Sequence, residues 1–228
     1  MIHPEIYSPN DILSLGPTSF LVTNDHLTQK HGWRTLEEVF NLRWTSWTNV
    51  VRVDLTSTGE VQVETVLAKE HNANGLAWGP DGEIMLVDTS GGVISRLSAL
   101  PSGKLSVIDR VQLDTTLDNP SYYHDNFATP QRNASAYILP GLTRGIDLDK
   151  TCRDPHGVNP WVVWTVKRIK SGGWEKKVLV EDDGGWMRSA SSAVIVGIDP
   201  EGNGGRKQGW DLIAGFLGEG VGVIKLDL

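Results

Sequence analysis

The sequence predicts an all-β protein of the β-propeller class. Short apolar runs rich in β-branched and aromatic residues recur along all 228 residues. The 25 glycines and 11 prolines lie between these runs at short intervals and do not gather into one linker. A motif of strand, Gly-Pro turn and strand also returns along the chain, as expected for repeated propeller blades.

Turn signals divide the chain into short strands. The expected strands are Phe20–Asn24, Val50–Leu55, Val61–Leu67, Leu76–Trp78, Ile84–Asp88, Val93–Leu97, Leu105–Leu113, Ala136–Leu139, Val162–Ile169, Lys176–Val180, Ala193–Ile198, Asp211–Phe216 and Gly222–Leu226. Tight turns are expected at Gly59, Asp81-Gly82 and Gly172-Gly173. The one expected helix, Thr35–Phe40, is short, so the alternating strands and helices of a doubly wound fold are excluded.

The clearest repeat joins two segments in the first half of the chain. Asn10 begins an apolar stretch that reaches a Gly16-Pro17 turn and then a second apolar strand. Asn74 begins a similar stretch that reaches Gly79-Pro80 and again a second strand. Strands alone would also suit a β-sandwich, but a repeat of this kind favours a propeller.

Two weaker copies of the repeat follow. One begins at Asp118-Asn119 and continues into a long loop, and another begins near Ser189. The spacing of the copies requires insertions, which are expected at His26–Thr48 and Thr143–Pro160. We therefore expect about four blades that together form a single propeller domain over residues 1–228.

The polar residues that begin the repeats form the candidate site. Equivalent loops of successive blades meet at the propeller axis, so Asn10, Asn74, Asp118 and Asn119 are expected to converge there. Amide oxygens with one carboxylate suit calcium, whereas zinc would prefer His or Cys ligands. The alternative is that each residue only stabilises a local turn, as Asn and Asp commonly do.

Charge and composition exclude several classes of partner. A net charge of −7 argues against nucleic acid and anionic membranes, which bind basic surfaces. No apolar stretch is long enough for a membrane-spanning segment, and Met1–Gly16 lacks the pattern of a signal peptide. The single cysteine, Cys152, excludes an internal disulfide and a Cys-based zinc site. The localisation stays open, and secretion of a longer parent protein is compatible with these features.

Several segments together resemble the paraoxonase/arylesterase family. Asn10–His26 is similar to the family signature, and Ala73–Leu76 and Leu117–Asn119 follow it in the family order. Trp44–Val51 is similar to the aromatic segment between the first two motifs. The resemblance covers nearly the whole chain and is best in residues 7–120.

This resemblance implies a six-bladed propeller with one catalytic and one structural calcium ion (Ca2+) in its central tunnel. By the resemblance, the ligands of the catalytic ion are Asn10, Asn74, Asp118 and Asn119. Asp11 is implied as a ligand of the structural ion, and Asp25 and His26 as residues lining the mouth of the active site.

The chain also departs from the family pattern. The family has about two further blades before its Asn-Asp motif, and these carry acidic calcium ligands and a pair of catalytic histidines. The late active-site histidine of the family should fall near Leu139–Thr143, which contains none, and we do not transfer that role to His124. We therefore expect this chain to be the C-terminal two-thirds of a six-bladed propeller, without its general base.

The resemblance implies a calcium-dependent hydrolase of carboxylic esters, especially aryl esters, and of lactones. Its partner would be a small-molecule ester or lactone, and the sequence does not predict an oligomeric state. The chain has no Gly-x-Ser-x-Gly motif, which disfavours a serine hydrolase. Two alternatives remain: a sugar-lactone hydrolase of the gluconolactonase type, and a non-catalytic propeller that serves as a binding platform.

Overall fold

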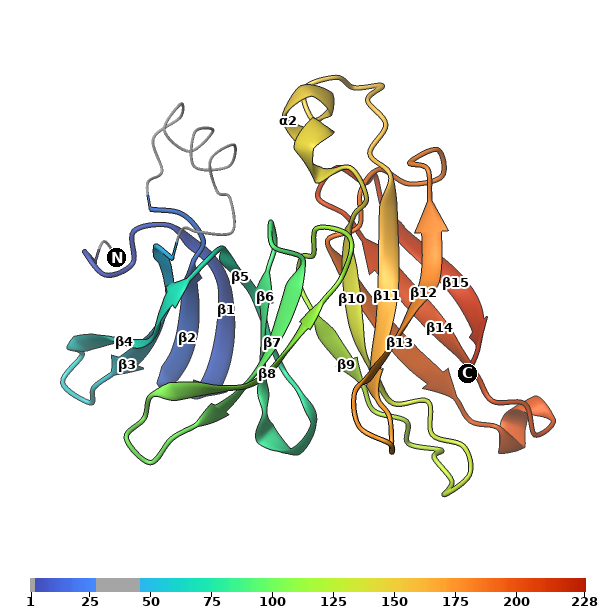
Figure 1. Ribbon diagram of the computed structural model, residues 1–228, viewed down its shortest axis with the longest axis horizontal. Helices are drawn as coiled ribbons and strands as arrows, with labels where there is room; N and C mark the ends of the chain where they lie inside the picture. The colour runs from blue at the N-terminus through green and yellow to red at the C-terminus, as the bar shows by residue number, and fades with distance from the viewer. Residues whose placement is uncertain (1–2, 28–45) are drawn as a thin grey trace. The chain divides into compact units, whose positions relative to one another are not determined.

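The computed structural model describes residues 3–27 and 46–228, and within them the protein is built almost entirely of β-strands (Figure 1). The described helices are single turns: η1 Pro80–Gly82, η2 Gly145–Asp147, α2 Leu148–Thr151 and η3 Glu201–Asn203. Within these residues no helix has the length and apolar character needed to cross a membrane. The chain divides into two compact units, residues 1–112 and 113–228.

The first unit contains two four-stranded antiparallel sheets whose strands follow chain order. The strands of its first sheet are β1 Pro9–Gly16, β2 Ser19–Asn24, β3 Thr48–Leu55 and β4 Val61–Glu70. The strands of its second sheet are β5 Ala73–Trp78, β6 Ile84–Asp88, β7 Val93–Ala99 and β8 Leu105–Gln112. Gly59 has φ 82° in the β3–β4 turn, a conformation that glycine adopts without steric cost.

The second unit contains one four-stranded and one three-stranded sheet, both antiparallel and in chain order. Its first sheet consists of β9 Ser121–Tyr123, β10 Ala136–Leu142, β11 Trp161–Arg168 and β12 Trp174–Asp182. Its second sheet consists of β13 Ser192–Ile198, β14 Gln208–Ala214 and β15 Val221–Asp227. Sequential four-stranded meanders are the topology of propeller blades.

The predicted fold class is confirmed, and the predicted repeats coincide with the sheets. Asn10 is the second residue of β1, and Asn74 is the second residue of β5. Asp118-Asn119 precedes β9 by two residues, and Ser189 lies three residues before β13. Each repeat start therefore marks the first strand of one sheet. The six-bladed closure and the single domain over residues 1–228 stay predictions.

Two local predictions have different outcomes. Ser121–Tyr123 was expected within a long loop but forms β9, which pairs with Ala136–Ile138. Its three residues are too few to show an alternating pattern, and the pairing partner lies beyond an irregular segment. The predicted helix Thr35–Phe40 lies outside the described residues.

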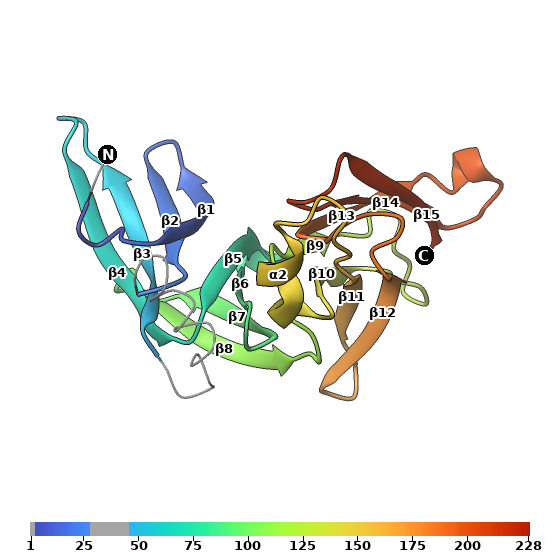
Figure 2. The ribbon, with the colours of Figure 1, turned by 90° about the horizontal axis from the view of Figure 1, so that it is seen from above.

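The core of the first unit lies between its two sheets (Figure 2), where β1 and β2 lie against β5. The buried side chains of this core are Leu13, Leu21, Val50, Val66, Ala73, Leu76, Ile84, Leu86, Leu97 and Leu105. Every residue from Ile84 to Val87 on β6 is buried, so this strand is covered on both faces. Strands covered on both faces read as continuous apolar runs, which is the pattern of Ile-Met-Leu-Val here.

The core of the second unit forms in the same way between β9–β12 and β13–β15. All seven residues of β10 are buried. Trp161 on β11 is fully buried, and its indole Nε1 donates a hydrogen bond of 2.8 Å to the carbonyl oxygen of Met187. This bond satisfies the one polar atom of the side chain and ties β11 to the segment before β13.

The sheet β13–β15 is apolar on both faces. Its inner face contributes Ala193, Ile195 and Ile213 to the core. Its outer face carries six side chains that are 37–59% exposed: Val194, Val196, Trp210, Leu212, Val221 and Val223. Cross-strand pairing places Val194 beside Leu212 and Leu212 beside Val223, so these side chains form a continuous surface. We call this surface the valine face.

A buried ion pair joins the β9–β10 connection to the segment before β14 in the second unit. Lys207, just before β14, pairs with Asp125 in the β9–β10 connection, and both side chains are almost fully buried. Lys207 Nζ also donates hydrogen bonds of 3.2 Å to the carbonyl oxygens of Phe127 and Arg132. Burial alone would raise the pKa of Asp125, but the Ala134 amide, Lys207 and the Phe127 amide donate hydrogen bonds that hold this pKa below its usual value.

Asp211 on β14 is also a buried carboxylate, but unlike Asp125 it has no hydrogen-bond partner among the described residues. Its side chain is fully buried on the inner face, between Ile195 on β13 and Ile224 on β15. Among the described residues, neither carboxylate oxygen has a hydrogen-bond partner. Burial without a partner raises the pKa of Asp211 to about 7.

We predict that Asp211 makes the protein less stable as the pH rises. Its folded-state pKa of about 7 exceeds the ordinary value of 3.8, so the folded state holds the proton over this interval. The free energy of unfolding should therefore fall from about pH 4 to about pH 7, at about 1.4 kcal/mol per pH unit at most. Asp211→Asn should remove this slope, as measured by urea unfolding between pH 4 and pH 8.

The matched control is Asp227→Asn, because Asp227 is an exposed carboxylate on the neighbouring strand β15. This control should leave the pH dependence of the wild type unchanged. An equal slope in the wild type and in Asp211→Asn would contradict the assignment of the slope to Asp211.

Candidate active site

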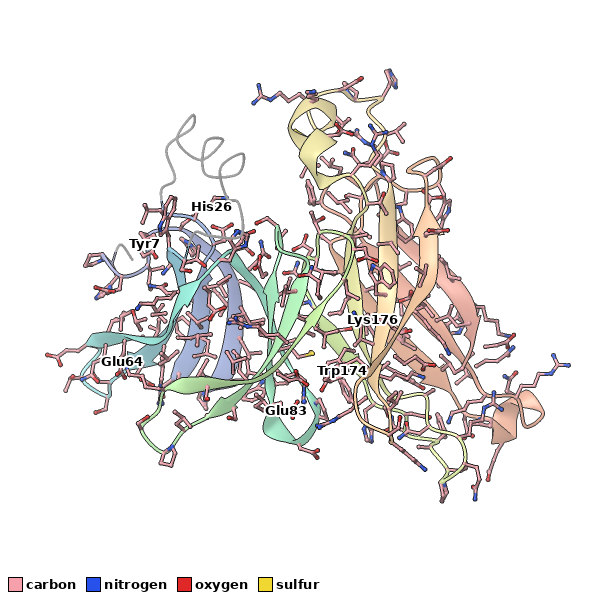
Figure 3. The ribbon with its side chains drawn as sticks, viewed as in Figure 1. Tyr7, His26, Glu64, Glu83, Trp174 and Lys176 are labelled. Atoms are coloured by element: carbon pink, nitrogen blue, oxygen red, sulfur yellow. The ribbon has the colours of Figure 1, made fainter. Side chains whose placement is uncertain are left out.

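The predicted site residues of the first unit lie at one end of its sheets. Asn10 and Asp11 open β1, and Asn74 opens β5. These strands begin beside the ends of β2 and β6, their antiparallel neighbours. Figure 3 shows His26 at this end of the unit and Glu83, in the β5–β6 turn, near the other end.

Asp25 is the centre of the polar contacts at this end. Its side chain is 4% exposed, and Ser8 Oγ donates a 2.8 Å hydrogen bond to Oδ1. Asn10 Nδ2 donates a 3.0 Å hydrogen bond to Oδ2. His26 Nδ1 lies 2.9 Å from Asp25 Oδ1, and the side chain of His26 is 7% exposed. The structure therefore brings together three predicted residues, Asn10, Asp25 and His26.

Asn72 connects this cluster to the second sheet of the unit. Its Nδ2 donates a 2.7 Å hydrogen bond to the backbone oxygen of Asp25. Its Oδ1 accepts hydrogen bonds from the backbone nitrogen and the hydroxyl of Ser90, at 3.1 and 2.9 Å. Sequence reasoning missed Asn72, although it stands two residues before Asn74 and shares its residue type.

A second histidine–carboxylate pair was also missed. His71 Nδ1 lies 3.0 Å from both carboxylate oxygens of Asp88, the last residue of β6. The backbone nitrogen of Gly91 donates a 2.8 Å hydrogen bond to Asp88 Oδ1. Asp88 lies beside the start of β5, so this pair is at the same end of the sheet as Asn74. The signal available in the sequence was a carboxylate at a strand end, as with Asp25.

Asn74 has a polar atom that the described protein does not satisfy. The residue is 9% exposed, and its Oδ1 is buried without a hydrogen-bond partner among residues 3–27 and 46–228. Leaving a buried acceptor unpaired is unfavourable by about 1–3 kcal/mol. A bound cation or a water molecule would remove this penalty, and an amide oxygen is a ligand type that a hard, oxygen-binding metal ion accepts.

Asp11 holds β1 and β5 together. Its Oδ2 accepts a 2.6 Å hydrogen bond from the backbone nitrogen of Leu76, and Oδ1 accepts a 2.7 Å bond from that of Ile12. Its own backbone nitrogen donates to Thr23 Oγ1 at 3.0 Å. Both carboxylate oxygens are thus engaged, and each keeps a second lone pair that a cation could use.

The remaining predicted ligands lie in the second unit. Asn119 forms a bridge with Ser192, where its backbone nitrogen donates to the oxygen of Ser191 at 3.0 Å. The backbone nitrogen of Asp118 donates to the oxygen of Pro140 at 2.9 Å. These residues therefore lie beside the start of β13, which is the equivalent position in the next sheet. Their convergence with Asn10 and Asn74 stays a prediction.

Acidic and histidine residues alone do not form a metal site here. In the described part of the chain, no group of three or more His, Cys, Asp or Glu side chains could hold a metal ion. His124, which follows β9, is exposed to solvent.

One similar solved structure is described as a putative gluconolactonase. It is 15% identical, the alignment covers 91% of this chain and 56% of that chain, and the TM-score is 0.42. The propeller assignment follows from the four antiparallel sheets of this protein.

Curated relatives are similar to the first half of the chain. Serum paraoxonase/arylesterase 2 of Bos taurus is 36% identical over 120 residues, which are 52% of this chain and 32% of that protein. The proteins of that name from Homo sapiens and Rattus norvegicus are 34% and 32% identical over the same shares of each chain. The match thus spans about a third of the length of each relative.

A family model gives the broader assignment. The model described as Arylesterase matches residues 1–128, which is more than half of the chain. This range contains every predicted site residue, from Asn10 to Asn119. The chain therefore belongs to the arylesterase family.

Proposed function

We propose that this chain is part of a calcium-dependent hydrolase of carboxylic esters, especially aryl esters, and of lactones. Membership of the arylesterase family supports the reaction class. Calcium binding is supported by the buried amide oxygen of Asn74, which has no hydrogen-bond partner among the described residues. The relatives are named serum enzymes, which supports secretion of the full-length parent as part of this proposal.

In this proposal Asn10 and Asn74 provide calcium ligands from the first unit. Asp118 and Asn119 are the ligands proposed from the second unit, and Asp11 is the ligand proposed for a structural ion. Neutral amide ligands leave most of the positive charge of the cation available to a substrate. Bound calcium would polarise the carbonyl group of an ester or lactone and stabilise negative charge on its oxygen.

Asp25 and His26 would handle protons in the same region. The Asp25 carboxylate, 2.9 Å from His26 Nδ1, favours a proton on that nitrogen. Nε2 is then the basic nitrogen of the ring, and it can accept a proton from an attacking water. Ser8 and Asn10 fix the carboxylate by hydrogen bonds to its two oxygens, which holds a negative charge beside the His26 ring.

We predict that Asn74→Ala weakens calcium binding without lowering the stability of the metal-free protein. The Asn74 oxygen makes no hydrogen bond within the described residues, so its removal should not lower the free energy of unfolding without calcium, and relief of the unpaired acceptor should raise it by up to about 1–3 kcal/mol. Calcium affinity should fall at least about tenfold, because the cation loses one of its six to eight oxygen ligands. Calorimetric titration and the calcium-induced shift in Tm would measure both effects.

Asn126→Ala is the matched control, because Asn126 is an exposed amide in the β9–β10 connection. It should bind calcium like the wild type. Equal calcium affinity in Asn74→Ala and Asn126→Ala would contradict the proposed ligand. A large loss of stability in metal-free Asn74→Ala would instead give Asn74 a purely structural role.

We predict that residues 1–228 hydrolyse phenyl acetate and a γ-lactone weakly, and that this turnover requires calcium. By the resemblance, the family's catalytic histidine pair and its acidic calcium ligands have no counterpart in residues 1–228, so we propose that His26 replaces the family's general base only poorly. Loss of a general base typically lowers the rate by about 10²- to 10⁴-fold. The measurement is initial rates with excess calcium and with a chelator, for the wild type and for His26→Gln.

His156→Gln, at an exposed position in the β10–β11 connection, is the control for the histidine substitution. Turnover that persists in the chelator would contradict the calcium mechanism. Robust calcium-dependent turnover that falls about 10²-fold or more in His26→Gln would overturn the predicted weakness and identify His26 as the base.

A further inference from the structure

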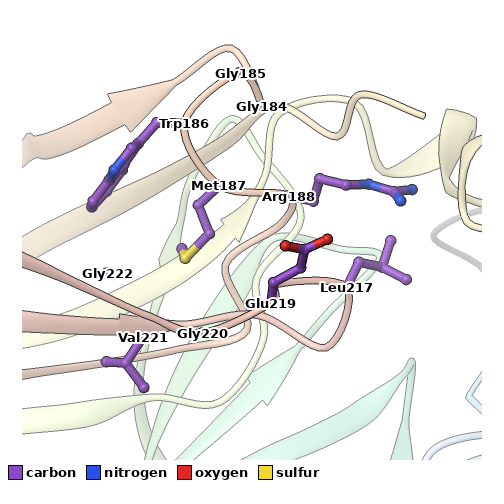
Figure 4. Close-up of a pocket in the computed structure, with 10 residues that line it drawn as sticks. All are labelled: Gly184, Gly185, Trp186, Met187, Arg188, Leu217, Glu219, Gly220, Val221 and Gly222. Carbon is purple, nitrogen blue, oxygen red and sulfur yellow. The ribbon is translucent and has the colours of Figure 1, made fainter. Parts of the chain in front are cut away.

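A cavity of about 300 Å³ lies in the second unit, and none of the residues of the proposed calcium site lines it (Figure 4). It is bounded by the β12–β13 connection, residues 184–188, and by residues 217–222 at the start of β15. The side chains that line it are Trp186, Met187, Arg188, Leu217, Glu219 and Val221. Four glycines in the two segments, Gly184, Gly185, Gly220 and Gly222, leave room between them.

Most of the cavity wall is apolar or aromatic. Trp186 is 54% exposed, and it is held in place by a ring contact with the buried Trp161, 6.2 Å between centroids. A side chain at Gly222 would meet the Trp186 ring at 2.6 Å, so only glycine permits this position of the indole. The indole is therefore a fixed surface with its remaining area open to a ligand.

Glu219 supplies the negative charge of the cavity. Among the described residues it has neither an ion-pair nor a hydrogen-bond partner. Figure 4 shows its side chain directed from the β14–β15 connection toward the segment that carries Met187 and Arg188. An anionic group beside an indole and a thioether is the combination that attracts an organic cation.

Arg188 keeps its positive charge, but its two Nη atoms donate hydrogen bonds to neutral oxygens of the protein. Nη1 donates to the carbonyl oxygen of Pro155 at 3.1 Å. Nη2 donates to the carbonyl oxygen of Thr151 at 2.9 Å and to Asn159 Oδ1 at 3.3 Å. These three acceptors engage only the Nη atoms, and Nε is buried without a hydrogen-bond partner among the described residues. The acceptor dipoles offset part of the repulsion between Arg188 and a cation in the cavity.

We propose that this cavity binds a small substituted ammonium ion with an apolar body. Glu219 pairs with the charge, and Trp186 contacts the alkyl groups around the nitrogen through a cation–π interaction. Met187, Leu217 and Val221 cover the apolar part of the ligand. This site is independent of the proposed ester hydrolysis, because it uses none of the residues assigned to calcium or to proton transfer.

The test compares choline with 3,3-dimethylbutan-1-ol, which has the same shape without the charge. Isothermal titration and saturation-transfer NMR on the full chain should show saturable choline binding, and the alcohol should bind at least tenfold more weakly. Glu219→Gln should weaken choline binding at least tenfold. Because Glu219 has no partner among the described residues, this variant should retain the wild-type circular dichroism and Tm.

Glu201→Gln is the matched control, since Glu201 is an exposed carboxylate on η3 in the same unit. It should bind choline like the wild type. Equal affinity for choline and for the alcohol would overturn the proposal and make the cavity merely apolar. Unchanged choline binding in Glu219→Gln, or no saturable binding by the wild type, would overturn it as well.

Discussion

The candidate site depends on the contacts of one residue, Asp25. Its backbone nitrogen donates to the oxygen of Ser8, and its carboxylate accepts from the side chains of Ser8 and Asn10. Its backbone oxygen accepts from Asn72, which lies 47 residues further along the chain. The end of β2, the start of β1 and the segment before β5 are thus fixed to one point. The neighbouring His26 lies with its Nδ1 2.9 Å from the same carboxylate.

Much of this architecture was predictable because it repeats. Asn10 and Asn74 could be aligned by their distance from a Gly-Pro turn, and each indeed opens a sheet. The partners of Asp25 could not be predicted in this way. Asn72 contributes through a hydrogen bond that spans two sheets, and such pairing depends on packing and not on local pattern. The convergence of the four predicted calcium ligands stays a prediction for a related reason, since they divide between the two units.

Asp211 shows another limit of pattern reading. Successive side chains of a strand point to opposite faces, so either Asp211 or both of its neighbours, Trp210 and Leu212, must face outward. The structure exposes Trp210 and Leu212 and buries Asp211. Asp125, in the same unit, is also buried but has Lys207 and two backbone amides as partners. The two carboxylates have opposite pKa shifts, which follow from their hydrogen-bond partners and not from their burial alone.

The valine face has a consequence for the thermodynamics of this chain. Its six large apolar side chains already contact water in the folded state, so unfolding hydrates less new apolar area than in a protein of this length with those side chains inside. Newly exposed apolar area determines both the heat-capacity increment of unfolding and the denaturant m-value. Both quantities should therefore be smaller than the chain length suggests. The curve of stability against temperature would be correspondingly flat, with cold denaturation displaced to lower temperature.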